Sequence, residues 1–420
     1  MTVDATERRR ALRRMLVLLG CFFVLVQVNR SAGGVLASYL ASVRGLSPTD
    51  IGAVMGAMFL AAALVQLPTG ILFDWIGPRR TLSYLGLLSV TGLVVFATVE
   101  GVWGMMAGRF AIGLGHGGVI TAVFLIAMAW APPKRIAQAT AAVIGIAGGV
   151  GGILATTPLA FALGHFGLPA TFLGIAAATA VVTLMLYFAL QDRPAPDAPD
   201  APDAPARSAE TLGETIAGLL VVMRMPELRR IFAMGFCFTA PFMTIGALWA
   251  GPYFTSIQNL DAETASLFLL GLVVALHLGT FCYGPLERLA RSRKRLILAG
   301  VGVEITALSV LVIWPDAPLA IAGASLFIFG LAAPFYVVLA AHTRSFVPAR
   351  RAGRAMTCLN LFGLTGVFVM QSGTGALIDL VARTGGAPVT GYRLVFLSVI
   401  VVLAASAAIY RRQPEAPGEV

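Results

Sequence analysis

Long apolar runs constrain this chain more than any other feature. Twelve stretches of mainly apolar residues, most of them about 20 residues or longer, are separated by short polar segments. Hydrophobic residues make up 58% of the 420 residues and charged residues only 12%. An apolar run of this length can cross the hydrocarbon core of a bilayer as a helix, which satisfies its own backbone hydrogen bonds. The sequence therefore predicts an all-α membrane protein with twelve transmembrane helices.

The twelve spans form two sets of six. Between the sets, residues 194–207 contain three Ala-Pro-Asp repeats, a composition typical of an extended, solvated linker. We expect residues 1–192 to form an N-terminal six-helix bundle and residues 229–420 a C-terminal one, with residues 193–228 as a cytoplasmic linker that includes a surface helix. The predicted spans are 13–41, 49–72, 81–99, 102–130, 137–163, 168–190, 230–254, 264–286, 296–314, 318–341, 355–380 and 391–410.

The positive charges indicate how the chain is oriented. With the N-terminus inside, 25 of the 30 Lys and Arg residues fall in cytoplasmic segments, and three lie outside. The net charge of +10 is thus dispersed over span ends, which favours contact with a lipid bilayer and excludes nucleic acid as the partner. We expect a multi-pass protein of a bacterial inner membrane with both termini in the cytoplasm. The last two cations, Arg30 and Arg109, lie within spans.

No pattern in the sequence indicates an enzyme. The four cysteines fall in apolar spans without the spacing of metal ligands or of a disulfide framework. A phosphate-binding loop with a Walker lysine is absent, as are paired carboxylates. The sequence predicts no cofactor, no metal and no catalytic residue.

The turn between spans 2 and 3 has an unusual composition. It runs from Gly70 to Arg80, with Asp74 ahead of the paired arginines Arg79 and Arg80 and a helix-breaking Gly77-Pro78 between them. The turn after span 8 repeats the arrangement, because Glu287 precedes another basic cluster. Internal repeats are typical of transporters. A plain membrane-edge turn with positive flanks is the alternative interpretation.

Two patterns resemble signatures of the major facilitator superfamily. The first cytoplasmic turn matches G-x-x-x-D-x-x-G-x-[KR]-[KR] at Gly70, Asp74, Gly77, Arg79 and Arg80, and span 4 carries R-x-x-x-G-x-G at Arg109, Gly113 and Gly115. The resemblance implies two six-helix bundles around a central cavity. It also implies that the protein works by alternating access. Asp74, the arginines and Glu287 would then belong to a cytoplasmic gate. In the second half Glu287 stands in place of Asp, and Ala290 in place of a usual Gly.

Charged residues inside a bilayer are costly and therefore point to function. Arg30 follows Asn29 near the middle of span 1, where a guanidinium should face water or an anion. Arg109 and His116 are seven residues apart, so they share one face of span 4, and Gly113 between them should leave that face open. We predict that Asn29, Arg30 and Arg109 bind substrate. The alternative is that the arginines only tie helices together.

His116 and Glu304 are the predicted proton-coupling residues. The stretch from Arg109 to Gly118 resembles the organic-anion branch of the superfamily (sialin and hexuronate relatives), where a Glu linked to proton coupling often stands at the position of His116. A histidine can take that role because it titrates near working pH. Glu304 is the only acid well inside a span. A neutral, hydrogen-bonded histidine is the alternative for His116, and we expect His277 to be a packing residue.

Further polar and aromatic side chains lie in the second set of spans. Tyr253, Tyr336, Asn360 and Gln371 can line a mostly apolar pocket around one or two charges. The alternative is that they pack helices. In span 5, Thr156-Thr157-Pro158 departs from the Gly-Pro signature of the family's antiporters, which favours uptake.

These observations predict a monomeric secondary transporter for a small organic anion, coupled to protons. Efflux of a drug-like or metabolite substrate is an alternative. Another is a transporter-like receptor that binds a ligand without moving it, although such a receptor has no need of the gate-like turn.

Overall fold

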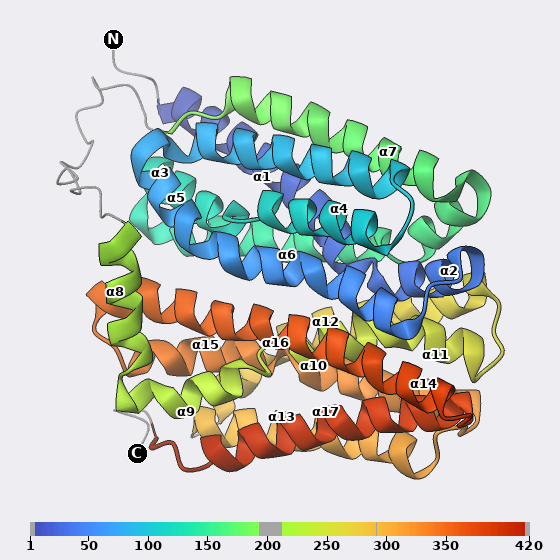
Figure 1. The fold of residues 1–420 in the computed structure, drawn as a ribbon. Helices are drawn as coiled ribbons and strands as arrows, with labels where there is room; N and C mark the ends of the chain where they lie inside the picture. The colour runs from blue at the N-terminus through green and yellow to red at the C-terminus, as the bar shows by residue number, and fades with distance from the viewer. Residues whose placement is uncertain (1–4, 193–211, 291, 416–420) are drawn as a thin grey trace.

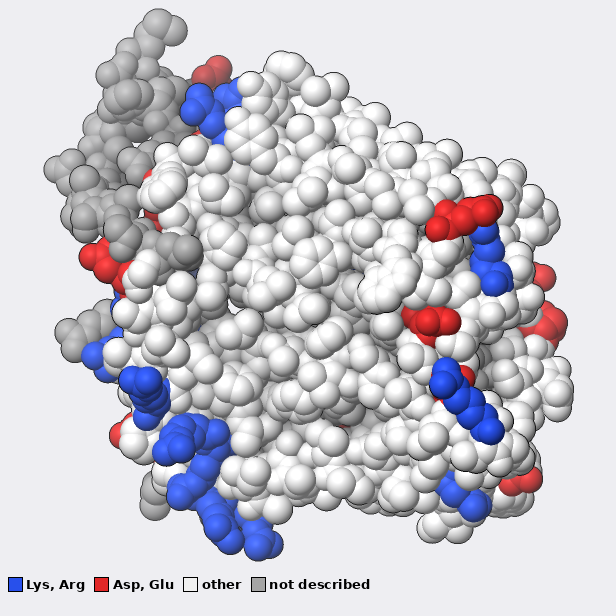
Figure 2. All heavy atoms as spheres, viewed as in Figure 1, with Lys and Arg blue, Asp and Glu red and all other residues white. Residues whose placement is uncertain are grey.

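The computed structural model describes residues 5–192, 212–290 and 292–415, and within these ranges the secondary structure is helical and contains no strand. On the face shown in Figure 2, charged side chains gather at the two ends of the molecule, and a broad uncharged band lies between them. Such a band is what a bilayer core requires of a protein surface. The fold is therefore that of a multi-pass membrane protein.

The helices in chain order are α1 (Ala5–Ser31), α2 (Gly33–Arg44), α3 (Pro48–Thr98), α4 (Val102–Gly115), α5 (Val119–Trp130), η1 (Pro133–Arg135), α6 (Ile136–Leu154), α7 (Thr157–Ala189), α8 (Leu212–Met223), α9 (Pro226–Gly235), α10 (Ala240–Thr244), the π-helix η2 (Ile245–Trp249), α11 (Ala250–Ser256), α12 (Ala262–Leu289), α13 (Arg293–Ile313), α14 (Leu319–Ala332), η3 (Ala333–Phe335), α15 (Tyr336–Ser345), α16 (Ala349–Arg383) and α17 (Pro388–Tyr410).

The prediction of twelve spans in two six-helix bundles is confirmed over the described residues. α3 contains spans 2 and 3, because Gly77 turns the chain with a φ of 78°. α7 contains the end of span 5 and all of span 6, separated by Gly167 with a φ of 72°. Glycine tolerates these positive φ values because it has no Cβ. Spans 1, 4, 5, 7 and 10 are each built from more than one helix.

The two halves of the chain lie side by side (Figure 1). α1 to α7 form one half and α9 to α17 the other, and both termini lie at the same end of the molecule, here called the terminus end. The opposite end, with the connections that contain Gly45 and Gly385, is called the far end. α8 lies at the terminus end and contacts both α3 and α16. The predicted linker residues 194–207 lie outside the described residues, and the exact boundaries between the halves stay a prediction.

Hydrogen bonds join the two halves toward the far end. Thr49 Oγ1 donates to Asp379 Oδ2 at 2.8 Å, and Ser266 Oγ lies 3.2 Å from Thr157 Oγ1. Outside α8, no other side-chain hydrogen bond between the halves is present among the described residues. The described hydrogen bonds therefore fasten the halves toward the far end.

Candidate functional site

A break in span 1 positions Arg30. α1 ends at Ser31 and α2 begins at Gly33, where a Cβ would collide with the carbonyl oxygen of Ala247 in span 7. Only glycine permits the two backbones to approach so closely. Half-buried Arg30 lies just before this crossing and therefore close to the interface between the halves.

A break in span 4 positions His116. α4 ends at Gly115, and the His116 N–H donates to the carbonyl oxygen of Ile112 at 3.0 Å. Gly118 then takes a φ of 77°, and a Cβ there would meet the Phe73 ring at 2.8 Å. The small residues after His116 let the broken helix pack tightly against span 2. His116 is thereby buried, with 2% of its surface exposed.

Arg109 joins the first four spans. Its Nη2 donates to the Asn29 carbonyl oxygen at 3.2 Å and lies 3.3 Å from Met55 Sδ. Its guanidinium carbon lies 5.7 Å from the centre of the Phe96 ring, within the range of a cation–π contact. Nε and Nη1 have no hydrogen-bond partner among the described residues. Arg109 thus contacts neighbouring spans, and two of its nitrogen atoms remain able to donate hydrogen bonds.

Asn29, Arg30, Arg109 and His116 form what we call the arginine cluster. The charges of both arginines act on the His116 ring, so the structure brings these residues together. Within the described residues Arg30 has no hydrogen bond or ion pair, and Asn29 Oδ1 and His116 Nδ1 have no partner. No carboxylate there pairs with either arginine. An unpaired positive cluster in a low-dielectric interior favours an anion strongly.

The face between Arg109 and His116 is not open as expected. Gly113 lies against the Met58 carbonyl oxygen of α3, and a Cβ at Gly113 would meet Ala61 Cβ at 2.9 Å. The glycine serves close helix contact, so that part of the prediction is wrong.

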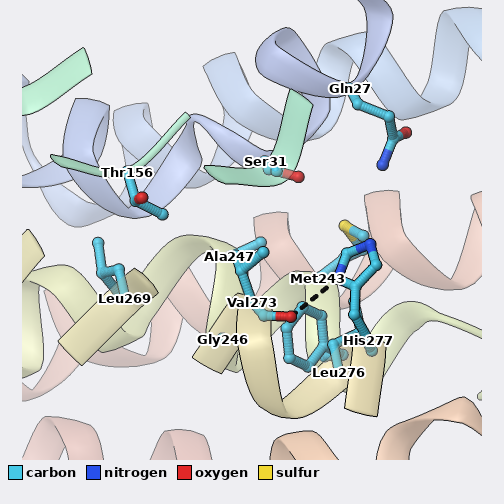
Figure 3. A pocket seen from close by; sticks show the side chains of 12 residues that line it. Gln27, Ser31, Thr156, Met243, Gly246, Ala247, Leu269, Val273, Leu276 and His277 are labelled. Atoms are coloured by element: carbon cyan, nitrogen blue, oxygen red, sulfur yellow. Dashed lines mark hydrogen bonds between the residues drawn. The ribbon is translucent and has the colours of Figure 1, made fainter. Parts of the chain in front are cut away.

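A cavity of about 20 Å³ lies between the halves (Figure 3), and two of its lining residues, Gln27 and Ser31, precede and follow Arg30 in the sequence. This volume is enough for one water molecule. Gln27 and Ser31 face it from α1, and His277 faces it from α12 on the other side. The full lining is Gln27, Ser31, Gly152, Thr156, Phe242, Met243, Gly246, Ala247, Leu269, Val273, Leu276 and His277.

Four residues predicted to bind substrate lie apart from this cavity in the present conformation. The Tyr253 hydroxyl donates to the Pro315 carbonyl oxygen at 2.9 Å, and the Tyr336 ring centre lies 5.4 Å from that of Phe238. Gln371 Nε2 donates to the carbonyl oxygen of Met243 at 2.8 Å, so it holds the backbone of a cavity residue. Asn360 is half-buried and has no hydrogen-bond partner among the described residues.

Glu304 lies inside the C-terminal half. Its side chain is buried, and Oε2 has no partner within the described residues. Its charge acts on Cys237 and Tyr283. The structure therefore places the two predicted proton-coupling residues in different halves.

The predicted gate turn at the terminus end is held by a residue that the sequence analysis did not select. Asp192, at the end of span 6, accepts a hydrogen bond from the Arg79 backbone N–H at 2.8 Å and lies against Gly77. Arg79 Nε donates to the Tyr187 carbonyl oxygen at 2.5 Å. Asp74 is exposed and has no hydrogen bond or ion pair within the described residues. In this conformation Asp192, not Asp74, caps the start of span 3.

The remaining gate residues differ in their contacts. Glu287 Oε1 lies 2.6 Å from Arg293 Nε, and Arg293 Nη1 donates to Ser345 Oγ at 3.1 Å. This network joins the terminus ends of α12, α13 and α15. Arg80 is exposed, and a Cβ at Gly70 would meet no heavy atom within 4 Å.

Gln27, Ser31 and Thr156 were also missed by the sequence analysis. Gln27 lies three residues before Arg30, so helical periodicity could have found it on the same face. Thr156 was noticed only as a departure from a signature, and nothing in its surroundings points to a cavity. The contact of Asp192 spans more than 100 residues of sequence and has no local signal.

A family model described as "Major Facilitator Superfamily" matches residues 18–369. Among proteins with known names, "Putative inorganic phosphate cotransporter" of Drosophila ananassae is 34% identical over 119 residues, which cover 28% of this chain and 24% of the relative. "Nitrate/nitrite transporter NrtP" of Picosynechococcus is 25% identical over 224 residues, 45% of this chain and 40% of the relative. The chain thus covers less than half the length of these relatives.

Solved structures share the fold over nearly the whole chain. A bacterial homologue of the human lysosomal transporter Spinster, in an inward-facing conformation, aligns with a TM-score of 0.74 at 15% identity, covering 95% of this chain and 96% of that one. A D-xylose-proton symporter aligns with a TM-score of 0.71 at 14% identity, covering 96% and 98%.

Proposed function

Because the chain belongs to the Major Facilitator Superfamily, we propose that it is a secondary transporter that takes up a small organic anion together with protons. It works by alternating access, has no cofactor and is not an enzyme. The observation that carries this proposal is the arginine cluster, whose two cations are not paired with any carboxylate in the described residues.

Arg30 and Arg109 neutralise the anion. Arg30 has no protein partner within the described residues, and Arg109 keeps Nε and Nη1 without partners. Unpaired buried donors are costly to maintain unless a ligand satisfies them. Asn29 Oδ1 is an acceptor without a partner in the described residues, so it can bond to a donor group of the cargo but not to the negative charge itself. The relatives named for inorganic phosphate and for nitrate/nitrite transport carry anions by name, which supports a negatively charged cargo.

His116 and Glu304 carry protons in this proposal. His116 Nδ1 is buried without a partner next to both arginine charges, so binding of an anion changes the charge around its ring. Glu304 Oε2 is equally unpartnered in the other half. The likeness of the fold to a proton symporter is compatible with coupling to protons.

Alternating access is supported by the position of the contacts between the halves. The Thr49–Asp379 and Ser266–Thr157 bonds fasten the far end. The gate at the terminus end, made of Gly70, Asp74, Gly77, Arg79, Arg80 and Glu287, then closes in the opposite state, when Asp74 finds a partner. Because the cavity holds only about one water molecule, cargo enters after the halves move apart.

We place the protein in a bacterial inner membrane as a monomer, with both termini and residues 193–228 in the cytoplasm. Residues 1–192 and 229–420 are the two moving bundles. In a wider cavity Tyr253, Tyr336, Asn360 and Gln371 complete the substrate-binding wall of the second bundle.

Uptake into proteoliposomes tests this function. The purified protein is reconstituted with a pH gradient, and labelled small organic anions are offered outside. We expect uptake that depends on the gradient and is lost in Arg30→Ala and Arg109→Ala. The control Arg44→Ala removes a cation that pairs with Glu100 at 3.7 Å in the far-end connections. Full uptake by both cluster variants would overturn the anion argument.

A further inference from the structure

The cavity receives very different side chains from the two halves. The N-terminal half contributes Gly152 and the polar side chains of Gln27, Ser31 and Thr156. The C-terminal half contributes Phe242, Met243, Gly246, Ala247, Leu269, Val273, Leu276 and His277. His277 is therefore the one polar side chain that the C-terminal half offers to the described cavity lining.

The His277 ring has a defined orientation. Its Nδ1 lies 2.8 Å from the carbonyl oxygen of Val273, one turn earlier in α12 (Figure 3). A carbonyl oxygen can only accept, so Nδ1 carries a proton and donates it. In the neutral ring Nε2 is then an acceptor, and it has no hydrogen-bond partner among the described residues. The backbone bond therefore presents an acceptor to whatever occupies this region.

The opposite helix leaves room for the ring. A Cβ at Gly149 of α6 would lie 3.4 Å from His277 Cδ2 and 3.5 Å from Nε2, and one at Gly152 would lie 3.7 Å from Cε1. Any side chain larger than a methyl group at Gly149 would cover Nε2. The glycines of span 5 thus keep the free nitrogen accessible.

His277 also borders a second hollow of about 280 Å³ between α6 and α12. Apart from His277, that hollow is lined by glycines and apolar side chains only, including exposed Ile146 and Phe281. It offers no second polar contact to a ligand. A polar cargo that uses Nε2 must therefore bind on the cavity side, opposite Gln27 and Ser31.

We propose that His277 is the binding residue of the C-terminal half, and that the cargo is an anion that also carries a hydrogen-bond donor such as a hydroxyl group. The donor group bonds to His277 Nε2 while the arginine cluster holds the negative charge. This inference rests on the proposed anion transport. A cargo that contacts both halves can bind one arrangement of the halves more tightly than another, which alternating access requires.

Paired ligands test the proposal. Purified protein is titrated with tartrate and lactate, and with succinate and propionate, which lack the hydroxyl groups. We expect the wild type to prefer the hydroxylated member of each pair. His277→Leu should lower that preference about two- to tenfold, the value of one hydrogen bond, without changing the affinity for the deoxy member. His277→Gln, whose amide oxygen accepts, should restore part of the preference.

Two further variants serve as controls. One removes a histidine outside the cavity, and the other blocks access to Nε2 while His277 stays in place. His165→Leu is the matched control, because His165 Nδ1 makes the same bond to a carbonyl one turn earlier, that of Phe161 at 3.0 Å, but lies exposed and away from the cavity. It should leave the preference unchanged. Gly149→Leu keeps the histidine but places a side chain larger than a methyl group over Nε2, so it should lower the preference as His277→Leu does.

If His277→Leu lowered the affinity for both ligands of each pair equally, His277 would not select for the hydroxyl group. That result would leave the proposed anion transport intact. The proposed role of His277 would also be overturned if His277→Leu kept the full preference for the hydroxylated ligands. Binding of none of the four probes, in a wild type that remains folded by circular dichroism, would count against the proposed anion function itself.

Discussion

The two halves of this protein differ in the charge that they bury. The N-terminal half holds Arg30 and Arg109, with His116 beside them, and no carboxylate in the described residues pairs with either arginine. The C-terminal half holds the carboxyl group of Glu304, whose charge acts on Cys237 and Tyr283. Because these groups lie in different halves, the carboxyl group does not pair with the arginines, and each half keeps buried polar atoms without a partner in the described residues. The difference suggests a division of tasks, with anion binding in the first half.

The difference extends to the cavity wall. Polar groups of the first half face an apolar surface of the second, interrupted only by His277 among the described lining residues. A cargo held by charge on one side and by shape and one hydrogen bond on the other keeps its position when the halves move. Substitutions in each half can therefore test this asymmetry.

Removing the free arginine should have the largest effect. Charged hydrogen bonds contribute about 1.5–3 kcal/mol, so Arg30→Ala should weaken anion binding about 10- to 100-fold. Its thermal stability should change little, because Arg30 has no partner to lose within the described residues. Calorimetric titration and a melting curve measure the two quantities. Arg109→Ala should lose stability as well, since its bond to Asn29 and its Phe96 contact disappear.

A loss of stability in Arg30→Ala equal to that in Arg109→Ala would contradict this distinction between the two arginines. The control Arg44→Ala should leave affinity within about twofold of the wild type, as expected for a residue outside the site.

Removing the hydrogen bond between Thr49 and Asp379 at the far end should have the next largest effect. Thr49→Val removes the hydroxyl that bonds to Asp379, a contribution of about 0.5–1.5 kcal/mol. The population with an open far end should therefore rise about two- to tenfold. Spin labels at Ser42→Cys and Thr390→Cys, in a background without the native cysteines, report the distance between the halves there. An unchanged distance distribution would mean that this bond does not hold the far end closed.

Coupling to protons should depend on the histidine of the cluster. The charges of Arg30 and Arg109 oppose protonation of His116 until a bound anion neutralises them, so His116→Gln should flatten the rise of uptake as the external pH falls, a change of up to about tenfold per pH unit. Initial uptake rates between pH 5.5 and 8 measure the slope. His165→Gln is the control. A slope identical to that of the wild type would remove His116 from the proton path.

Glu304→Gln should have the smallest effect on binding. The amide keeps the shape of the side chain and removes its charge, and the residue lies in the half away from the anion. We expect anion affinity within about twofold of the wild type, with a weaker accumulation driven by the pH gradient. Calorimetry and counterflow separate the two. A large loss of affinity would mean that Glu304 belongs to the anion site, and it would contradict the proposed difference between the halves.

The architecture could be predicted because a bilayer imposes strong rules on sequence. Length and apolarity identify each span, and the turn at Gly77 was predicted, whereas the break at Gly118 inside span 4 was not. The pairing of Arg109 and His116 was predictable because both lie in span 4, whereas the position of Arg30 near them depends on the packing of span 1 against span 4. Other features were not, because they depend on contacts between distant spans. Asp192 replaces Asp74 at the gate turn, and Gly113 serves packing instead of opening a face.

His277 is the clearest example of a residue whose role could not be predicted from the sequence. Nothing around it in the sequence differs from an ordinary apolar helix, and a self-bonded histidine satisfies the expectation of a packing residue. Its importance arises only from the position of α12 opposite α1 and from the glycines of α6. Such a role follows from the packing of the two halves and not from a local pattern.

The central claim is that the N-terminal half binds the negative charge of the cargo. The most direct test is the melting temperature of the purified wild type with carboxylates and with their uncharged amides, repeated for Arg30→Ala. The account predicts that a carboxylate raises the melting temperature of the wild type, that its amide does not, and that Arg30→Ala loses the difference. Equal stabilisation by a carboxylate and its amide, in both proteins, would contradict it.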